Sequence, residues 1–419
     1  MSAPTLTEAL RVYGRIGVLS FGGPAAQIAL MHKELVEDRP WLTEKQYLNA
    51  LSFCMLLPGP EAMQLATYAG WRLHGVRGGL AAGLLFVLPG ALFMLLLAGV
   101  YAAVGAAPLA EALFLGVKAA VVVIVIQALR KVAGRALDGA AHWVIAALAF
   151  VAIFVFALPF PLIVAAAAAY GFLFSGGAEG EAPPPPPPRS GRAALITAVI
   201  WLAIWIAPLL AVGAASGMLA EIGAFFSRLA VVTFGGAYAV LAYMAQEVVA
   251  DFGWLQPGEM LDGLGLAETT PGPLILVTEF VGFLAAEKAG GFWFGVAGAA
   301  VALWATFAPC FLWIFVGAPY IDWIGTQPRL RGALSAITAA VVGVILNLTI
   351  WFALHVFFTE VSEERAGPLV LWTPALASFD ARAAALTALC ALLMLRFKWG
   401  LATTLGLSAA LGVIASCFV

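Results

Sequence analysis

The sequence predicts an all-α polytopic membrane protein, built from two inverted homologous halves with broken or re-entrant helices and about 13 membrane elements. Of its 419 residues, 63% are hydrophobic and only 11% are charged, and the mean hydropathy is +1.00. Several apolar runs are long enough, or nearly so, to cross about 30 Å of hydrocarbon as helices. One segment also occurs twice. Strand-type alternation is absent, which argues against a β-barrel.

The repeated segment covers residues 8–60, and a shift of 213 positions places it on residues 221–273. About 19 of about 53 ungapped positions are identical, whereas chance matching in so Ala-, Leu- and Gly-rich a chain gives roughly one in ten. An internal duplication follows from this excess. The identities include residue types that an apolar composition alone would not align: Arg15 with Arg228, Glu34 with Glu247, Asp38 with Asp251, and Trp41 with Trp254.

A proline-rich linker separates the two copies. It contains the run Pro183 to Pro188 and almost no apolar side chains, which is typical of a solvated, partly extended spacer. The apolar helix after it has no counterpart in the first copy and crosses once, so the second copy starts on the other side. We therefore predict a first repeat over residues 1–175, a linker over 176–192, an inverting transmembrane helix over 193–212 and a second repeat over 213–419.

Each repeat opens with two interrupted segments. The first, residues 8–35, contains Gly22-Gly23-Pro24, where glycines cost backbone entropy and proline removes a hydrogen bond, so the helix should break. The second, residues 47–71, is interrupted by Pro58-Gly59-Pro60. These segments either cross the membrane fully or are re-entrant. The other long helices are expected over residues 78–103 with a kink at Pro89-Gly90, 110–129, 143–174 as a pair, 292–317 and 334–358.

Basic residues in short loops indicate the orientation, because cytoplasmic loops are enriched in Lys and Arg. They follow every second helix of the first half, whereas the corresponding loop of the second half, residues 359–380, is acidic. The acidic loop 246–258 departs from this pattern, which keeps re-entrant segments as an alternative. We expect a multi-pass protein of the plasma (inner) membrane, with its N-terminus inside and its C-terminus outside. The basic loop residues are Arg72, Arg77, Arg130, Lys131, Arg135, Arg189 and Arg192.

The repeated breaks favour an oxyanion site, because unwound backbone in a membrane is tolerated where it lines a cavity or is buried in protein. A helix that begins after Pro60 or Pro273 presents unpaired N–H groups with positive partial charge. Adjacent glycines let N–H groups approach an oxyanion closely, and paired arginines add full charge. The candidate binding residues are Arg15, Ser20, Phe21, Gly22, Gly23, Pro24, Gln27, Pro58, Gly59, Pro60, Glu61, Gln64, Arg228, Thr233, Phe234, Gly235, Gly236, Tyr238, Thr269, Thr270, Pro271, Gly272 and Pro273.

Charged residues near these motifs have competing interpretations. Arg15 and Arg228 either bind the anion or snorkel as interfacial anchors. Glu268 and Glu279 flank the second Pro-Gly-Pro and either carry a coupling proton or pair with a basic residue. Lys118 lies in the middle of an apolar helix and is expected to snorkel.

At these motifs the chain resembles the chromate transporter family of ion transporters, and the resemblance covers nearly the whole chain. It implies transport of chromate, with sulfate as the related tetrahedral dianion, commonly as efflux that confers resistance. The second copy has Ala237 for Pro24 and Leu274 for Glu61, so Glu61 becomes a third coupling candidate without a mirror partner. The motifs that carry the resemblance are Phe21 to Pro24, Leu57 to Ala66, Phe234 to Tyr238 and Thr269 to Pro273.

Other functions fit the sequence less well. An anion channel or a sulfate-type uptake carrier shares the same ligand chemistry and stays open as an alternative. No His-Glu-x-x-His, Gly-x-Ser-x-Gly or Walker-type loop is found, so neither an enzyme nor a nucleotide-driven pump is expected. A net charge of -2 with no basic run offers nothing for nucleic acid. No cofactor or metal is expected, since Cys54, Cys310, Cys390 and Cys417 lie in apolar stretches without paired spacing.

Overall fold

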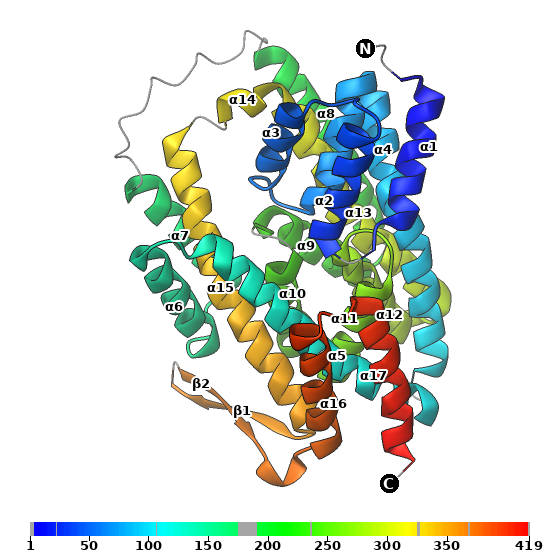
Figure 1. Cartoon of the computed structure of the whole chain (residues 1–419), viewed down its shortest axis with the longest axis vertical. Coiled ribbons are helices and arrows are strands. Elements are labelled where there is room, and N and C mark those ends of the chain that lie inside the picture. Colours follow the sequence, from blue (N-terminus) through cyan, green and yellow to red (C-terminus); the bar gives the residue numbers. More distant parts are fainter. Residues whose placement is uncertain are drawn as a thin grey trace. The chain divides into compact units, whose positions relative to one another are not determined.

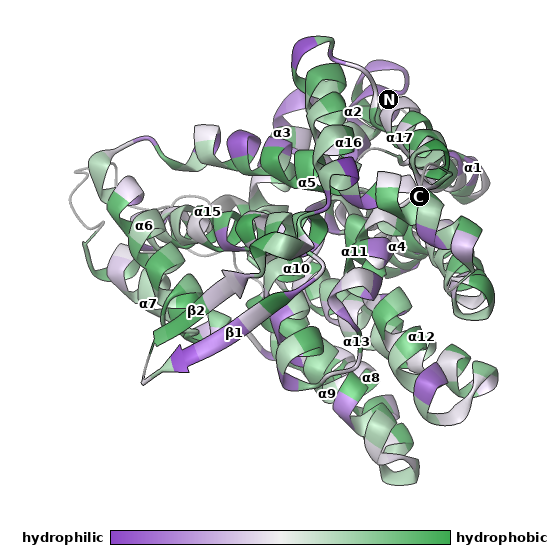
Figure 2. Ribbon diagram, turned by 90° about the horizontal axis from the view of Figure 1, so that it is seen from below, coloured by the Kyte–Doolittle hydropathy of each residue, from purple (hydrophilic) through white to green (hydrophobic). Residues whose placement is uncertain are grey.

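The computed structural model describes residues 4–21, 23–105, 107–174, 191–234, 237–324, 327–367 and 369–417. These residues are almost entirely helical, and most helices are hydrophobic along much of their length (Figures 1 and 2). Three of the predicted site residues, Gly22, Gly235 and Gly236, lie outside the described residues. The proline run of the predicted linker lies outside them as well.

Five helices in the described ranges are long and apolar enough to cross a membrane, which confirms an all-α polytopic membrane protein. They are α4 (Glu61–Val104), α5 (Pro108–Ala136), α8 (Gly191–Ala215), α13 (Phe292–Gly317) and α15 (Pro328–Phe357). Shorter apolar helices are α6 (Ala140–Phe154), α7 (Phe160–Phe174) and α17 (Leu401–Ser416).

The helices break where the sequence predicts. Helix α1 (Leu6–Leu19) stops before the first Phe-Gly-Gly, and α9 (Gly217–Val232) stops before the second. The shift of 213 positions that aligns the sequences also aligns the elements that follow to within about two residues. The matching elements are α2 (Gly23–His32) with α10 (Ala237–Gln246), the π-helical turns η1 (Lys33–Glu37) with η2 (Glu247–Asp251), and α3 (Glu44–Cys54) with α11 (Pro257–Thr269).

Helix α4 is two helices joined by a sharp turn. His74 and Gly75 leave the helical region, and Gly75 has a φ of 62°. The two parts touch where a Cβ on Gly70 would lie 2.2 Å from the carbonyl oxygen of Gly78, so both positions require glycine. Pro89, where the sequence suggested a kink, lies within the second helical part. In the second repeat, η3 (Leu274–Leu276), α12 (Val277–Gly290) and α13 correspond to α4.

The chain divides into two compact units. The first unit comprises Met1–Gly99, Ser175–Ala237 and Ala267–Arg331. The second unit comprises Val100–Phe174, Tyr238–Leu266 and Gly332–Val419.

In the first unit, α13 packs against α8, α9 and α12. Trp304 of α13 donates from Nε1 to the carbonyl oxygen of Trp205 at 3.1 Å, and Trp201 stacks on Phe311. Only 6% of the most apolar window of α8 is buried, which is typical of a helix that faces lipid.

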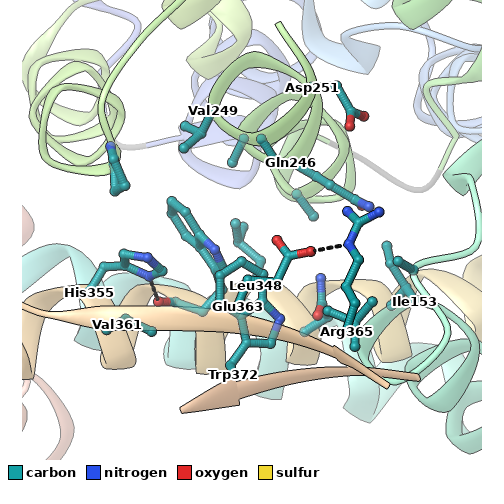
Figure 3. A pocket seen from close by; sticks show the side chains of 18 residues that line it. Ile153, Gln246, Val249, Asp251, Leu348, His355, Val361, Glu363, Arg365 and Trp372 are labelled. Carbon is teal, nitrogen blue, oxygen red and sulfur yellow. Dashed lines mark hydrogen bonds and ion pairs between the residues drawn. The ribbon is translucent and has the colours of Figure 1, made fainter. Parts of the chain in front are cut away.

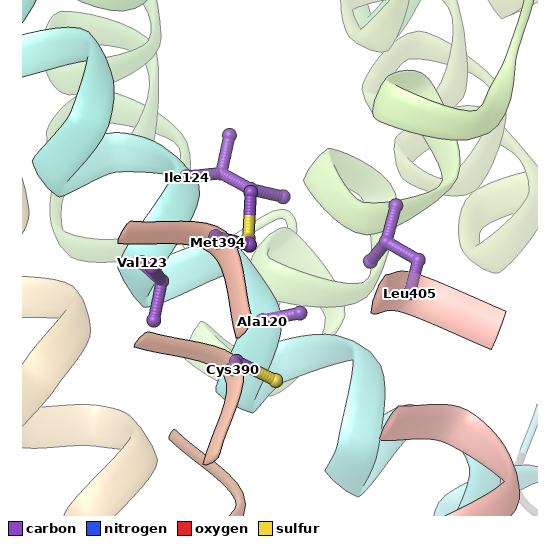
Figure 4. Close-up of a cluster of buried hydrophobic side chains, with 6 residues drawn as sticks. All are labelled: Ala120, Val123, Ile124, Cys390, Met394 and Leu405. Carbon is purple, nitrogen blue, oxygen red and sulfur yellow. The ribbon is translucent and has the colours of Figure 1, made fainter. Parts of the chain in front are cut away.

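In the second unit, α5 packs against α16 (Ala381–Ala391) and α17. Gly116 of α5 lets Ser408 approach closely enough to donate to its carbonyl oxygen at 2.7 Å. Figure 4 shows the apolar cluster at this contact, which includes Cys390 as a buried core residue. Its members are Ala120, Val123, Ile124, Cys390, Met394 and Leu405.

The predicted acidic loop 359–380 contains a β-hairpin that the sequence pattern does not predict. Strand β1 (Val361–Ala366) pairs antiparallel with β2 (Leu369–Pro374), in a register that places Glu363 opposite Trp372. Nearly all of β1 is exposed and hydrophilic (Figure 2), so it lacks the alternation that identifies a strand.

Candidate functional site

The breaks of the two repeats are bonded to each other crosswise within the first unit. The N–H of Gly272 donates to the carbonyl oxygen of Ser20 at 2.8 Å, and that of Gly59 donates to the carbonyl oxygen of Thr233 at 2.9 Å. The shift of 213 positions turns Ser20 into Thr233 and Gly59 into Gly272. Reciprocal contacts of this kind are the signature of a two-fold relation. The structure therefore joins each Pro-Gly-Pro break to the end of the first helix of the other repeat.

The two central glycines are required by the backbone. Gly59 has a φ of 114° and Gly272 a φ of 87°, a region that other residues disfavour. Gly59 is also closely surrounded, because an added Cβ would lie 2.9 Å from Gln64 Nε2 and 3.0 Å from Cys310 Sγ. The prolines on either side fix φ and leave no N–H of their own. Each break thus presents one donor to the opposite repeat.

The buried hydroxyl groups at these breaks lie where helices α1 and α9 end. Ser20 donates from Oγ to the carbonyl oxygen of Ile16 at 2.6 Å, and Thr233 donates from Oγ1 to that of Leu229 in the same way. Because each hydroxyl proton is already used, Ser20 and Thr233 offer only acceptor lone pairs to a ligand in this conformation.

Two buried glutamines of the first repeat line the breaks, one at each break. Gln27 donates from Nε2 to the carbonyl oxygen of Gly272 at 2.6 Å, and Gln64 donates from Nε2 to that of Pro58 at 2.7 Å. The Oε1 atoms of Gln27 and Gln64 are buried without a hydrogen-bond partner among the described residues. Such oxygens are costly unless a donor reaches them. They are places where a water or a protonated ligand oxygen would be held.

The arginine of the first repeat is already paired. Arg15 Nε lies 3.6 Å from Glu34 Oε1, and the same carboxylate is bonded to Arg39. The side chain of Arg15 is 60% exposed, whereas that of Glu34 is 4% exposed. Arg228 of the second repeat is exposed on α9. The charge of Arg15 is therefore shared with a buried anion.

The other predicted residues differ in burial. Thr270 is buried beside the second break, whereas Thr269 and Phe21 are exposed. Phe234 is half-buried, and Gly23 begins α2 with a φ of 78°, followed by a half-buried Pro24. Tyr238 belongs to the second unit, and the other described candidates belong to the first. The buried prolines of the two breaks are Pro58, Pro60, Pro271 and Pro273.

The three coupling candidates are carboxyl groups in different surroundings. Glu61 is half-buried at the first position of α4, and Glu268 is buried near the end of α11. Glu279 lies in the first turn of α12 and is 3% exposed. Its Oε2 has no hydrogen-bond partner in the part of the chain that the structure describes. An ionised carboxylate without a partner is costly to bury, so this position suits a group that binds a proton.

A cavity of about 410 Å³ in the second unit was not anticipated (Figure 3). Helices α10 and α15, the turn η2 and the β-hairpin surround it, and Trp351 and His355 form an aromatic wall with ring centroids 4.1 Å apart. On the hairpin, Arg365 Nε pairs with Glu363 Oε1 at 2.7 Å. With Asp251 also in the lining, carboxylates outnumber the guanidinium group, so the cavity suits an oxyanion poorly.

The sequence does not reveal this cavity, because residues 153–157, 242–257 and 347–372 line it together although they are far apart in the chain. The spacing of Trp351 and His355, four residues apart on an apolar helix, was the one local signal. Within the described ranges, no group of three or more His, Cys, Asp or Glu side chains is arranged to hold a metal ion.

Comparisons with known proteins give a consistent result. The family model described as "Chromate transporter" matches residues 7–172 and 220–413. The chain is 32% identical over 362 residues to a chromate transport protein of Cupriavidus metallidurans, which covers 84% of each chain. It is 32% identical over 371 residues to a chromate transport protein of Pseudomonas aeruginosa, covering 85% of this chain and 82% of the relative. A probable chromate transport protein of Synechococcus elongatus is 31% identical over 350 residues, covering 83% of this chain and 84% of the relative. No solved structure matches.

Proposed function

Because this chain belongs to the chromate transporter family, we propose that it is a secondary transporter that exports chromate across the plasma (inner) membrane, with sulfate as a related substrate. The matched family residues include both repeats and the breaks within them. Export would confer resistance to chromate. Chromate and sulfate are both tetrahedral dianions, so a site made mainly of backbone N–H groups accepts either.

The substrate site in this proposal is the pair of crossed breaks. The observation that carries it is the reciprocal bonding of Gly59 to Thr233 and of Gly272 to Ser20. Beyond each break a helix begins, and its first N–H groups have no carbonyl partner within the helix. Those groups carry positive partial charge. Two such helix starts, related by a two-fold operation, would present donors to one dianion from two directions.

In this proposal the guanidinium groups of Arg15 and Arg228 supply full positive charge to the substrate site. A dianion that leaves water loses a large hydration energy, and neutral donors alone rarely replace it. The side chain of Arg15 is exposed enough for a dianion to compete with Glu34 for its guanidinium group. Arg39 would then keep the carboxylate of Glu34 satisfied.

Coupling to protons is assigned to the carboxyl groups beside the breaks, Glu61, Glu268 and Glu279. Glu279 has the most suitable surroundings, because it is buried and one of its oxygens lacks a partner among the described residues. Glu61 at the start of α4 would repel a bound anion when it is ionised, and protonation would remove this repulsion.

Transport by the purified full chain in proteoliposomes tests the proposal. Labelled chromate and sulfate would be offered with imposed pH and voltage gradients. We expect saturable chromate flux that unlabelled sulfate inhibits. Flux that rises linearly with concentration would indicate the alternative, an anion channel. Chromate-independent sulfate uptake would indicate a sulfate-type uptake carrier. Absence of flux of either ion would refute the proposal.

A further inference from the structure

A partly buried charged network within the second unit joins the end of α4 to α5 and α11. Lys118 Nζ of α5 lies 3.2 Å from Asp262 Oδ1 of α11, and Tyr101 of α4 donates from its hydroxyl to Asp262 Oδ2 at 2.8 Å. Asp262 is 5% exposed. Lys118 was expected to snorkel, but its ammonium group points to a carboxylate within the protein. Ionisable groups inside membrane helices are costly and usually functional.

The charged pair lies on the same helix face as two glycines. Gly258, Asp262 and Gly265 are spaced by four and three residues, so they lie on one side of α11. A Cβ on Gly258 would lie 3.3 Å from Lys118 Nζ, and one on Gly265 would lie 2.1 Å from Val117 Cγ1. Helix α5 therefore lies directly against this face. The glycines allow this close approach, and the ion pair adds a charged contact between the two helices.

Helix α11 leads directly to the second Pro-Gly-Pro break. Asp262 precedes Thr269, the last residue of the helix, by two turns, or about 10 Å at the usual rise. Pro271 and Gly272 follow, and Gly272 makes the crossed bond to Ser20. A change in the position of α11 would therefore act on the backbone of the proposed substrate site.

We propose that Asp262 is the binding site for a coupling proton and that its ion pair with Lys118 is a latch between α5 and α11. Protonation of Asp262 removes its charge, breaks the ion pair and frees α11. Among the described residues, Glu259 of α11 and Glu111 of α5 also act electrostatically on Tyr101, and Glu259 acts on Asp262 as well. This inference rests on the proposed function, because a coupling proton matters only if the protein transports an ion.

A purely structural ion pair is the alternative, and the first repeat argues against it. The shift of 213 positions places Asn49 where Asp262 stands. The corresponding helix, α3, therefore forms with a neutral side chain of the same shape. Asp262→Asn is accordingly a substitution that this helix is expected to accept, and it imitates the protonated state.

Two assays on the reconstituted full chain distinguish a latch that a proton opens from a purely structural ion pair. One measures exchange of labelled chromate between equal pools, which needs no net proton movement. The other measures net chromate transport driven by an imposed pH gradient. We expect Asp262→Asn and Lys118→Gln to keep exchange within about twofold of wild type, and to reduce the gradient-driven component at least about tenfold. Asp138→Asn is the control, because Asp138 pairs with His142 at an exposed site of the same unit. It should leave both assays unchanged.

The outcomes are distinguishable. If wild-type protein carries no oxyanion in either assay, the proposed function fails. If it exchanges chromate but ignores the pH gradient, or if Asp262→Asn keeps a wild-type response to the gradient, the latch is refuted. If Asp262→Asn loses both activities, the double variant with Lys118→Gln decides. Recovery of exchange alone supports the latch, whereas recovery of gradient-driven transport, or of neither activity, overturns it.

Discussion

The N–H of Gly59 donates to the carbonyl oxygen of Thr233 at 2.9 Å, and this bond joins the first repeat to the second at a helix break. It has a mirror image in the bond from Gly272 to Ser20. Each half therefore satisfies a backbone group that the other half leaves open by breaking its helix. Both bonds are buried, where an unpaired backbone group costs about 1–3 kcal/mol.

Replacement of Gly59 by alanine should damage this arrangement. The positive φ disfavours any side chain by about 1–3 kcal/mol, and the new Cβ would press on Gln64 and Cys310. We expect chromate flux per folded protein to fall at least about tenfold, with a smaller effect for Gly272→Ala. Gly14→Ala is the control, since nothing lies within 4 Å of its added Cβ. Wild-type flux in Gly59→Ala would show that the break tolerates distortion.

Removal of the charge of Arg15 or Arg228 should weaken substrate binding. We expect Gln at either position to lower the apparent affinity for chromate at least about tenfold, or about 1.4 kcal/mol, with Lys intermediate because it keeps the charge but loses the fork of donors. Concentration dependence of flux gives the affinity. Arg11→Gln is the control, because Arg11 is exposed on α1 and aligns with Ala224. Unchanged affinity in both Gln variants would leave backbone N–H groups as the whole site.

Glutamine substitutions at two buried glutamates should affect stability in opposite ways. Glu34 bonds to Arg15 and Arg39, so Glu34→Gln should cost about 1–3 kcal/mol and lower the melting temperature. Glu279→Gln should be neutral or stabilising, because it removes a carboxyl group that is buried with an unsatisfied oxygen. Thermal unfolding in one detergent compares them directly. A large loss of stability in Glu279→Gln would mean that its carboxyl group has a structural partner.

The start of α16 should depend on pH through Asp380. Partial burial raises the pKa of this carboxyl group, but hydrogen bonds from the Arg382 side chain and from the N–H groups of Ala383 and Arg382 outweigh burial and hold the pKa below its ordinary value. The stabilisation is therefore present above the unfolded-state pKa of about 3.9 and is lost as pH falls through the folded-state value.

Asp380→Ala should lower the free energy of unfolding at pH 7 by about 0.5–2 kcal/mol through loss of the helix cap. Asp380→Asn should retain most of the stabilisation by the cap, because the side-chain oxygen of Asn still accepts from the N–H groups. Melting temperatures recorded from neutral to acid pH should show the difference between wild type and Asp380→Ala shrinking below the folded-state pKa. A difference that does not change with pH would contradict a charged cap.

The helix breaks were predictable because clustered Gly and Pro disfavour a helix locally, as in Gly22-Gly23-Pro24 and Pro58-Gly59-Pro60, whereas the pair Pro89-Gly90 is accommodated within α4. The crossed bonds were not predictable, since nothing in the residues around Ser20 says that its carbonyl oxygen meets Gly272. The same holds for Lys118. Its partner Asp262 is visible only once α5 lies against α11. Features set by neighbouring residues could therefore be predicted from the sequence, whereas contacts between residues far apart in the chain could not.

The glutamines at the breaks make the two copies unequal. Gln27 and Gln64 belong to the first copy, and the shift of 213 positions places Val240 and Val277 at their counterparts. A pair of separate identical subunits would have to carry each amide twice or not at all. Fusion into one chain allows the first copy alone to supply an amide to each break, Gln27 at Gly272 and Gln64 at Pro58, while its partner copy keeps aliphatic side chains at the matching positions.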